Sequence, residues 1–201
     1  MGVGIEVLIV DWDRVEATPA SKRSELLEQA AFGDDEYEGG LDEEGLIWSS
    51  AADADWYGRY AFRRTLGSYK PHFWAGERWE HVRDFAEPGL RTSLDQFMAA
   101  LFWQGLEYVA KEDPRGLPER ECPWDADLLM WRPPDDIAAI KGFWAQAAPD
   151  LDTLREPFAQ HAAVPDGWIR DFESFAEFLN GWGEVVAEAD RRGWGIVGLR
   201  C

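Results

Sequence analysis

The two ends of the chain each carry a short apolar segment, and this pair constrains the fold more than any other feature. Residues 5–10 are apolar except for Glu6, and residues 194–199 have the same character. Short apolar runs rich in β-branched residues are typical of buried strands. We therefore expect the chain to begin and end with a strand.

The sequence between these two segments has mostly helical periodicity. Apolar residues recur at three- and four-residue intervals, which is the spacing of an amphipathic helix, over residues 20–32, 94–109, 137–144, 151–158 and 172–189. Shorter apolar runs predict strands at residues 46–48 and 128–131, and residues 52–66 are predicted to be helical. Strands at both ends with helices between them favour one α+β domain over residues 1–201, helix-rich, in which the terminal strands share a small sheet.

Two local signals predict where helices begin and end. Thr92 to Asp95 has the pattern of a capping box, so we expect a helix to start there and to continue through Val109. Gly193 directly follows Arg191 and Arg192, which is typical of the end of a helix.

The charge of the chain limits its partners. Aspartate and glutamate number 39 against 20 lysines and arginines, for a net charge of −19. Duplex DNA and anionic membranes need a positive face, so neither is expected to bind, whereas a basic protein would be attracted. Residues 34–45 form an expected acidic mobile loop, since seven acids and no basic residue fall within residues 34–44.

No signal for export, membrane insertion or cofactor binding stands out. The apolar runs are shorter than a membrane span, and the first basic residue is Arg14. Cys122 and Cys201 are the only cysteines, too few for a zinc site, and they are expected to be free thiols. We expect a cytoplasmic protein without a cofactor.

The C-terminal third carries a series of short motifs at helix–helix–strand spacing. They are residues 132–137 (RPPDDI), Leu154, Arg155, Phe158, residues 165–168 (PDGW), residues 175–182, Ala189, Gly193 and residues 195–199. In these motifs, and in its opening Met-Gly and first strand, the chain resembles the YfbM-like family of uncharacterised bacterial proteins, over about a third to a half of its length. The resemblance implies a compact α+β fold, and it implies no activity and no functional residues.

Asp11 and Asp13 directly follow the first apolar segment. An apolar strand followed by Asp-x-Asp resembles the first motif of haloacid-dehalogenase-like phosphatases, in which the first aspartate is the nucleophile and the second a general acid/base beside Mg²⁺. The remaining motifs of that family are not recognisable in the sequence. A polar end to a strand is therefore the alternative interpretation.

Arginines and aromatic residues alternate in residues 56–91, the one part of the chain that breaks the acidic trend. Arg59, Arg63, Trp74 and Arg78 are the candidate ligand-binding residues, because guanidinium groups beside aromatic rings recognise anions and planar ligands. The alternative is that the aromatic rings belong to the core and the arginines pair with the excess acids.

Three functions remain open at this stage. The first is a non-catalytic binding protein that acts through protein–protein contacts, such as an inhibitor or immunity protein directed at a basic partner. The second is a Mg²⁺-dependent phosphatase-like hydrolase that uses Asp11 and Asp13. The third is a binder of a small anionic ligand that uses the arginine/aromatic stretch.

Overall fold

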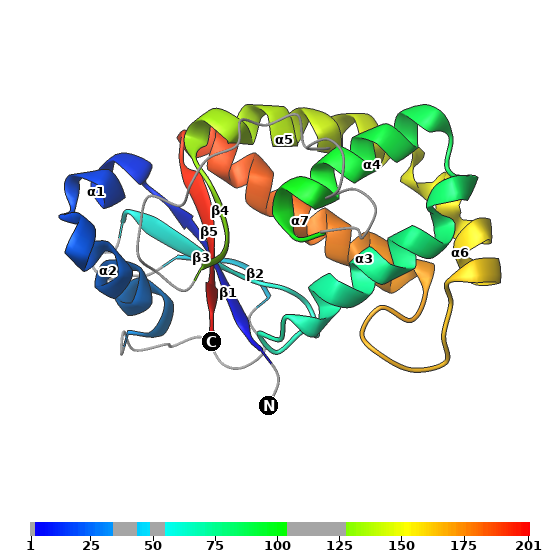
Figure 1. Ribbon diagram of the computed structural model, residues 1–201, viewed down its shortest axis with the longest axis horizontal. Coiled ribbons are helices and arrows are strands. Elements are labelled where there is room, and N and C mark those ends of the chain that lie inside the picture. The colour runs from blue at the N-terminus through cyan, green and yellow to red at the C-terminus, as the bar shows by residue number, and fades with distance from the viewer. Residues whose placement is uncertain (1–2, 34–43, 49–54, 104–127) are drawn as a thin grey trace.

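A computed structural model describes residues 3–33, 44–48, 55–103 and 128–201, and it confirms the expected α+β fold (Figure 1). Within these residues, five strands form one antiparallel sheet in the order β2-β3-β1-β5-β4. The strands are β1 (Ile5–Val10), β2 (Gly45–Trp48), β3 (Tyr57–Ala61), β4 (Leu128–Arg132) and β5 (Gly195–Arg200).

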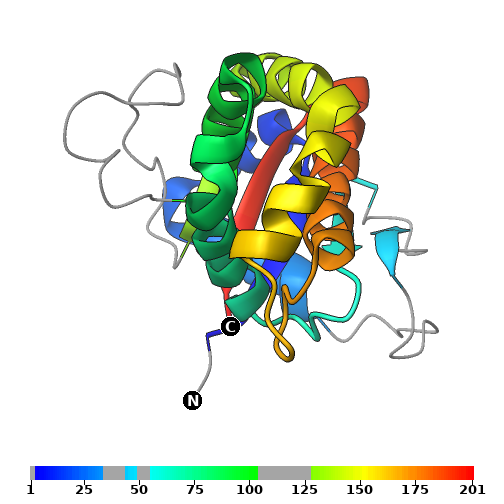
Figure 2. The same cartoon turned by 90° about the vertical axis from the view of Figure 1, so that its right-hand side faces the viewer.

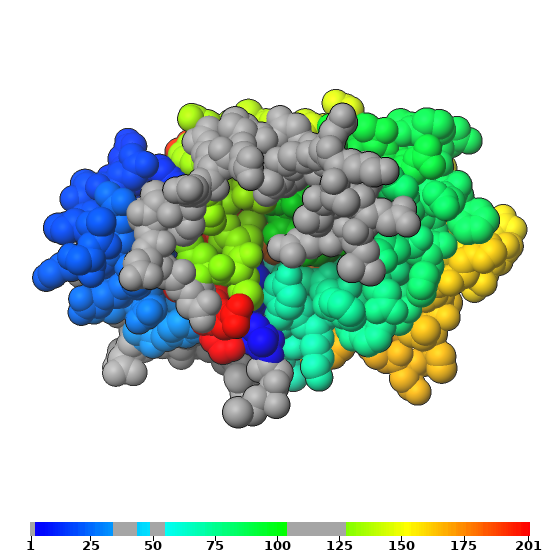
Figure 3. Space-filling view, in the orientation of Figure 1, coloured from blue at the N-terminus to red at the C-terminus, as the bar shows by residue number. Residues whose placement is uncertain are grey.

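The two terminal strands lie side by side at the centre of the sheet, as expected. β1 and β5 are paired over their whole length, from Ile5 opposite Arg200 to Val10 opposite Gly195. The pairing continues beyond the strands, where the Gly4 amide donates to the Cys201 carbonyl at 2.7 Å. The first and last described residues therefore adjoin on the molecular surface, in blue and red in Figure 3.

Both faces of the sheet are covered by helices. Successive strand side chains point to opposite faces, so Val7 and Ile9 enter the larger core while Leu8 and Val10 enter a smaller one. The smaller core lies under α1 (Trp12–Ala17) and α2 (Ala20–Phe32). The remaining helices pack on the opposite face, as the side view shows (Figure 2).

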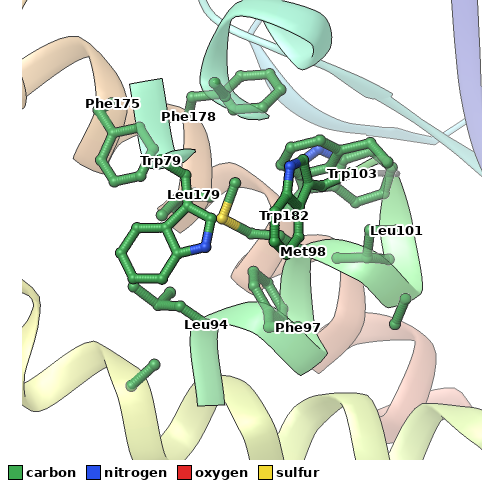
Figure 4. Close-up of a cluster of buried hydrophobic side chains, with 14 of the residues drawn as sticks. Trp79, Leu94, Phe97, Met98, Leu101, Trp103, Phe175, Phe178, Leu179 and Trp182 are labelled. Atoms are coloured by element: carbon green, nitrogen blue, oxygen red, sulfur yellow. The ribbon is translucent and has the colours of Figure 1, made fainter. Parts of the chain in front are cut away.

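The larger core is built from aromatic side chains of several helices. These helices are α3 (Lys70–Val82), α4 (Pro88–Leu101), α5 (Pro134–Ala147), α6 (Arg155–His161) and α7 (Phe172–Arg192), with 3-10 turns at Arg83–Phe85 and Ala148–Leu154. Trp79 of α3 and Trp182 of α7 are fully buried in it. Figure 4 shows how these tryptophans enclose Met98 of α4. Burial of such large rings contributes much of the stability of a domain.

α7 follows its sequence signals closely. It begins after Asp171, whose carboxylate accepts from the Ser174 amide at 2.8 Å while the Ser174 hydroxyl caps the Asp171 amide. It ends at Gly193, which has the left-handed conformation (φ 68°) that favours glycine. No helix among the described residues is long and apolar enough to cross a membrane.

Two predictions about local structure are wrong. Residues 57–61 form strand β3 rather than a helix, because pairing with β1 and β2 stabilises the extended chain. The helix expected from Thr92 begins at Pro88 and ends at Leu101, so the predicted capping box lies inside it. Asp95 of that motif is buried and accepts from the Trp79 indole at 2.9 Å and from Arg83 at 2.7 Å. The Asp95 carboxylate therefore forms hydrogen bonds within the core and does not cap the helix.

Candidate functional site

A cleft of about 800 Å³ lies between the segment after β3, the N-terminal half of α7 and the loop of residues 162–171 that precedes α7. Figure 2 shows these segments at the same end of the molecule. Aromatic side chains line the interior, chiefly Tyr60, Phe62, Trp168 and Phe178. Clefts of this size with aromatic linings are typical of small-molecule sites.

The close approach of β3 and α7 positions this aromatic lining. A Cβ atom on Gly181 would lie 3.0 Å from the Tyr60 hydroxyl oxygen and 3.2 Å from the Phe62 ring. Glycine is therefore the residue that lets the two aromatic side chains lie against the helix. The Phe62 ring then packs on Phe178 and Trp182, with ring centroids 5.2 and 5.0 Å apart.

Most charged side chains of the cleft neutralise one another at its rim. Arg63 bonds Glu177 at 3.2 Å and Glu44 at 3.1 Å. Arg155 bonds Asp152 at 3.0 Å and also contacts Glu173. These pairs are largely exposed to solvent, and exposed ion pairs contribute little to stability. Such pairs can exchange partners with a ligand at small cost.

Tyr60 and Glu184 form a hydrogen bond at one end of the cleft. The Tyr60 hydroxyl donates to a Glu184 carboxylate oxygen at 2.7 Å. Burial, then the hydrogen bond to Glu184 and the negative charge of that carboxylate, raise the pKa of Tyr60. The phenol therefore stays protonated and holds the carboxylate in place.

Two charges in the cleft lack a partner of opposite sign among the described residues. Arg64 lines the cleft and has no ion pair there, and Glu184 accepts from Tyr60 and forms no ion pair within that part of the chain, although the charge of Arg63 acts on the Tyr60 hydroxyl. Arg64 also has a left-handed backbone (φ 57°), as do Leu66 (φ 50°) and Gly67 (φ 68°) in the same segment. Left-handed residues other than glycine cost about 1–3 kcal/mol each and cluster at functional sites.

The outer wall of the cleft is held by α3. The loop closes on itself through the Val164 amide, which donates to the Arg170 carbonyl at 2.9 Å. Arg78 of α3 is buried and donates to the Ile169 carbonyl at 3.2 Å. Its guanidinium also lies 5.0 Å from the ring centroid of Trp74. Arg78 and Trp74 thus position the loop that carries Trp168.

The four candidate ligand-binding residues do not form one site. Arg63 lines the cleft, whereas Arg59 pairs with Glu6 at 3.1 Å, and Trp74 and Arg78 support the cleft wall from behind. Arg64, Phe178 and Glu184 were not selected from the sequence. Phe178 belongs to a helical apolar stripe that predicts only burial, and no pattern links residue 64 to residue 184.

Asp11 and Asp13 lie at the start of α1, where both have roles in the structure of the helix. Asp11 caps the helix, and its carboxylate accepts from the Arg14 amide at 3.3 Å. Asp13 is exposed in the first turn, where a negative charge suits the helix dipole. The strand before them lies in an antiparallel sheet rather than a doubly wound parallel one. Among the described residues, no group of three or more His, Cys, Asp or Glu could hold a metal ion.

A polar residue, His72 of α3, lies behind the aromatic lining of the cleft. It is buried among the rings of Phe62, Tyr69, Phe178 and Trp182, with centroids 4.8–5.6 Å away. Neither imidazole nitrogen has a hydrogen-bond partner among the described residues. Burial lowers the pKa of His72 to about 3, and the Tyr69 backbone opposes this only in part. The ring is therefore neutral at physiological pH.

Comparison with known proteins finds no match to a family model, a curated protein or a solved structure. The resemblance to the YfbM-like family stays a prediction. The functional argument therefore depends on the cleft and its residues alone.

Proposed function

We propose that this protein is a non-catalytic binding protein whose cleft takes a small organic ligand with an anionic group. The observation that carries this proposal is Arg64, a guanidinium without an ion pair among the described residues, on a cleft with an aromatic interior. A guanidinium presents a planar array of donors that matches a carboxylate or a phosphate. Of the functions open from the sequence, the binding of a small anionic ligand has the most support.

The interior of the cleft supports binding of a flat or apolar ligand body. Phe62 and Phe178 are buried and packed against each other, so their positions are set before a ligand arrives. A preformed site avoids the entropy cost of ordering side chains on binding. Arg63, Arg155 and Arg170 are held by acids, which leaves Arg64 as the cation available to an anion among the described lining residues.

Two other sequence hypotheses stay predictions. Attraction of a basic protein was expected from the net charge of the chain, and residues 34–43 of the expected acidic loop lie outside the described residues. Glu44, from the end of that segment, bonds Arg63 at the rim of the cleft. The phosphatase hypothesis depends on Asp11 and Asp13, for which the structure offers a helix cap and a first-turn position.

A fragment screen by NMR tests the proposed function. We expect small organic acids to shift the amide signals of residues 62–65 and 167–181. Asn180 is exposed and lines the cleft, so Asn180→Trp should fill it and abolish those shifts. Ala187→Trp, at an exposed position of the same helix outside the cleft lining, is the matched control and should leave binding intact. Fragments that bind equally well to both variants, or no binding at all, would overturn the proposal.

A further inference from the structure

We infer that the ligand of the cleft is an aromatic monocarboxylate rather than a phosphate ester, with its carboxylate on Arg64 and its ring on Trp168. This inference rests on the proposed function, and it adds the charge of the anionic group and the residue that takes the ring. Three observations carry it, namely the charge balance of the cleft, the N-terminus of α7 and the exposure of the aromatic lining.

The charged side chains that line the cleft balance one another among the described residues. They are four arginines and four acids, namely Arg63, Arg64, Arg155, Arg170, Asp152, Glu173, Glu177 and Glu184. Of these arginines, Arg64 is the one without an ion pair in the described part of the chain. A carboxylate adds one negative charge to this balance, whereas a phosphate monoester adds about 1.5 to 2 at neutral pH. In a chain of net charge −19, repulsion by the acids of the cleft therefore disfavours the phosphate.

The N-terminus of α7 borders the cleft and already holds a carboxylate of the chain itself. Helix N-termini bind phosphate through their free amides and their dipole. Here the Ser174 amide donates to the Asp171 carboxylate at 2.8 Å, and Glu173 adds a second negative charge in the first turn. Both Glu173 and Ser174 line the cleft. A phosphate at this helix end would have to displace Asp171 and would be repelled by Glu173, so the usual phosphate anchor is closed.

Trp168 is the aromatic ring of the described lining that a ligand can reach. The other aromatic rings of the lining are buried, and they are Tyr60, Phe62, Phe172 and Phe178. Trp168 is half-buried, and within the described residues it makes no ring contact with another aromatic side chain. Its loop is anchored by the hydrogen bond from Arg78 to the Ile169 carbonyl. The indole therefore offers a positioned surface on which a planar ring can pack.

NMR titration of the full chain with three compounds that share one ring system tests the inference. The compounds are 2-naphthoate, 2-naphthyl phosphate and the uncharged 2-naphthamide. The naphthoate should bind more tightly than the naphthamide by about tenfold or more, as expected for a charge-assisted hydrogen bond to a guanidinium. It should also bind more tightly than the phosphate by about tenfold, because the acids of the cleft repel the additional charge.

Two variants assign the two contacts. Arg64→Asn should weaken the naphthoate by about tenfold but leave the naphthamide unaffected, and asparagine tolerates the left-handed backbone at this position. Trp168→Leu should weaken both compounds by about threefold or more, because each loses the aromatic surface. Lys22→Gln on α2 and Trp48→Leu on β2 are the matched controls, since both residues are exposed and lie outside the cleft lining, and they should change nothing.

The comparison of the three compounds on the parent chain does not depend on any variant being folded. Binding of the phosphate as tightly as the naphthoate would overturn the inference and leave the proposed function standing. A failure of the naphthoate to bind while other acidic fragments still occupy the cleft would do the same. Naphthoate binding that is unchanged in Arg64→Asn or in Trp168→Leu would also overturn the inference. If no acidic compound binds the cleft at all, the proposed function is overturned together with it.

Discussion

Phe62 and Phe178 form an aromatic wall with a polar region on each side. The two regions touch the same rings but differ in burial, charge and hydrogen bonding. On its inner side, His72 is buried, neutral and without a hydrogen-bond partner among the described residues. On its outer side, arginines and acids pair in contact with water. The same pair of rings therefore stabilises the core on its inner side and lines the proposed binding cleft on its outer side.

The difference follows from the environment rather than from residue type. A buried polar group without a partner lowers stability by about 1–3 kcal/mol, because it gives up its hydrogen bonds to water and forms none in the protein. An exposed ion pair costs little to form and little to break. Polar residues on the outer side can therefore exchange partners with a ligand, whereas His72 cannot.

Removal of the shared wall should produce the largest effect. Phe178→Ala should lower the free energy of unfolding by about 3–5 kcal/mol, because it leaves a cavity beside His72 and Phe102. Urea denaturation followed by tryptophan fluorescence measures this loss. A cost below about 1 kcal/mol would mean that the ring lies on the surface and that the two regions are not separated by a wall. Phe73→Ala, on an exposed ring of α3, is the control.

The inner side should make the protein sensitive to acid. The pKa of His72 is about 3 in the folded chain and 6.5 when unfolded, so between these values only the unfolded chain takes up the proton. Stability should fall as the pH drops below 6.5, with His72 contributing about 1.4 kcal/mol per pH unit. At about pH 5 this loss amounts to roughly 2 kcal/mol.

His72→Leu should remove that part of the acid sensitivity and should be at least as stable as the parent chain at neutral pH, since it replaces an unpartnered polar ring with an apolar side chain. Denaturation curves across this pH range measure the difference between the two proteins. An unchanged pH slope in the variant would show that His72 is not kept neutral by burial. His161→Leu, on an exposed histidine, should leave the slope unchanged.

The outer side should tolerate loss of a charge with the smallest effect. Glu177→Gln breaks the ion pair with Arg63, whose side chain is 62% exposed, and should cost less than about 1 kcal/mol of stability. Thermal unfolding at low and high salt measures this cost, which salt should reduce further. A much larger loss would mean that the rim pair is part of the core, and the contrast between the two sides of the wall would disappear.

Elements with a strong local pattern were predictable from the sequence. The terminal segments at residues 5–10 and 194–199 are apolar enough to predict strands, and the order of strands and helices along the chain favoured their pairing. α7 was predictable because its apolar stripe from Phe172 has helical spacing and because Gly193 ends the helix directly after two arginines. In these cases short-range chemistry and the tertiary structure agree.

Elements that depend on distant partners were not predictable. β3 is extended because β1 and β2 flank it, and Asp95 is buried in a helix because Trp79 and Arg83 meet it there. The cleft depends on distant partners most of all, since Tyr60 meets Glu184 across 124 positions of sequence. The sequence by itself determined the α+β class, the paired chain ends and the last helix, because each follows from the order and periodicity of its own residues. Only the tertiary structure decided which arginine faces a cleft, because charge pairing depends on what folding brings near.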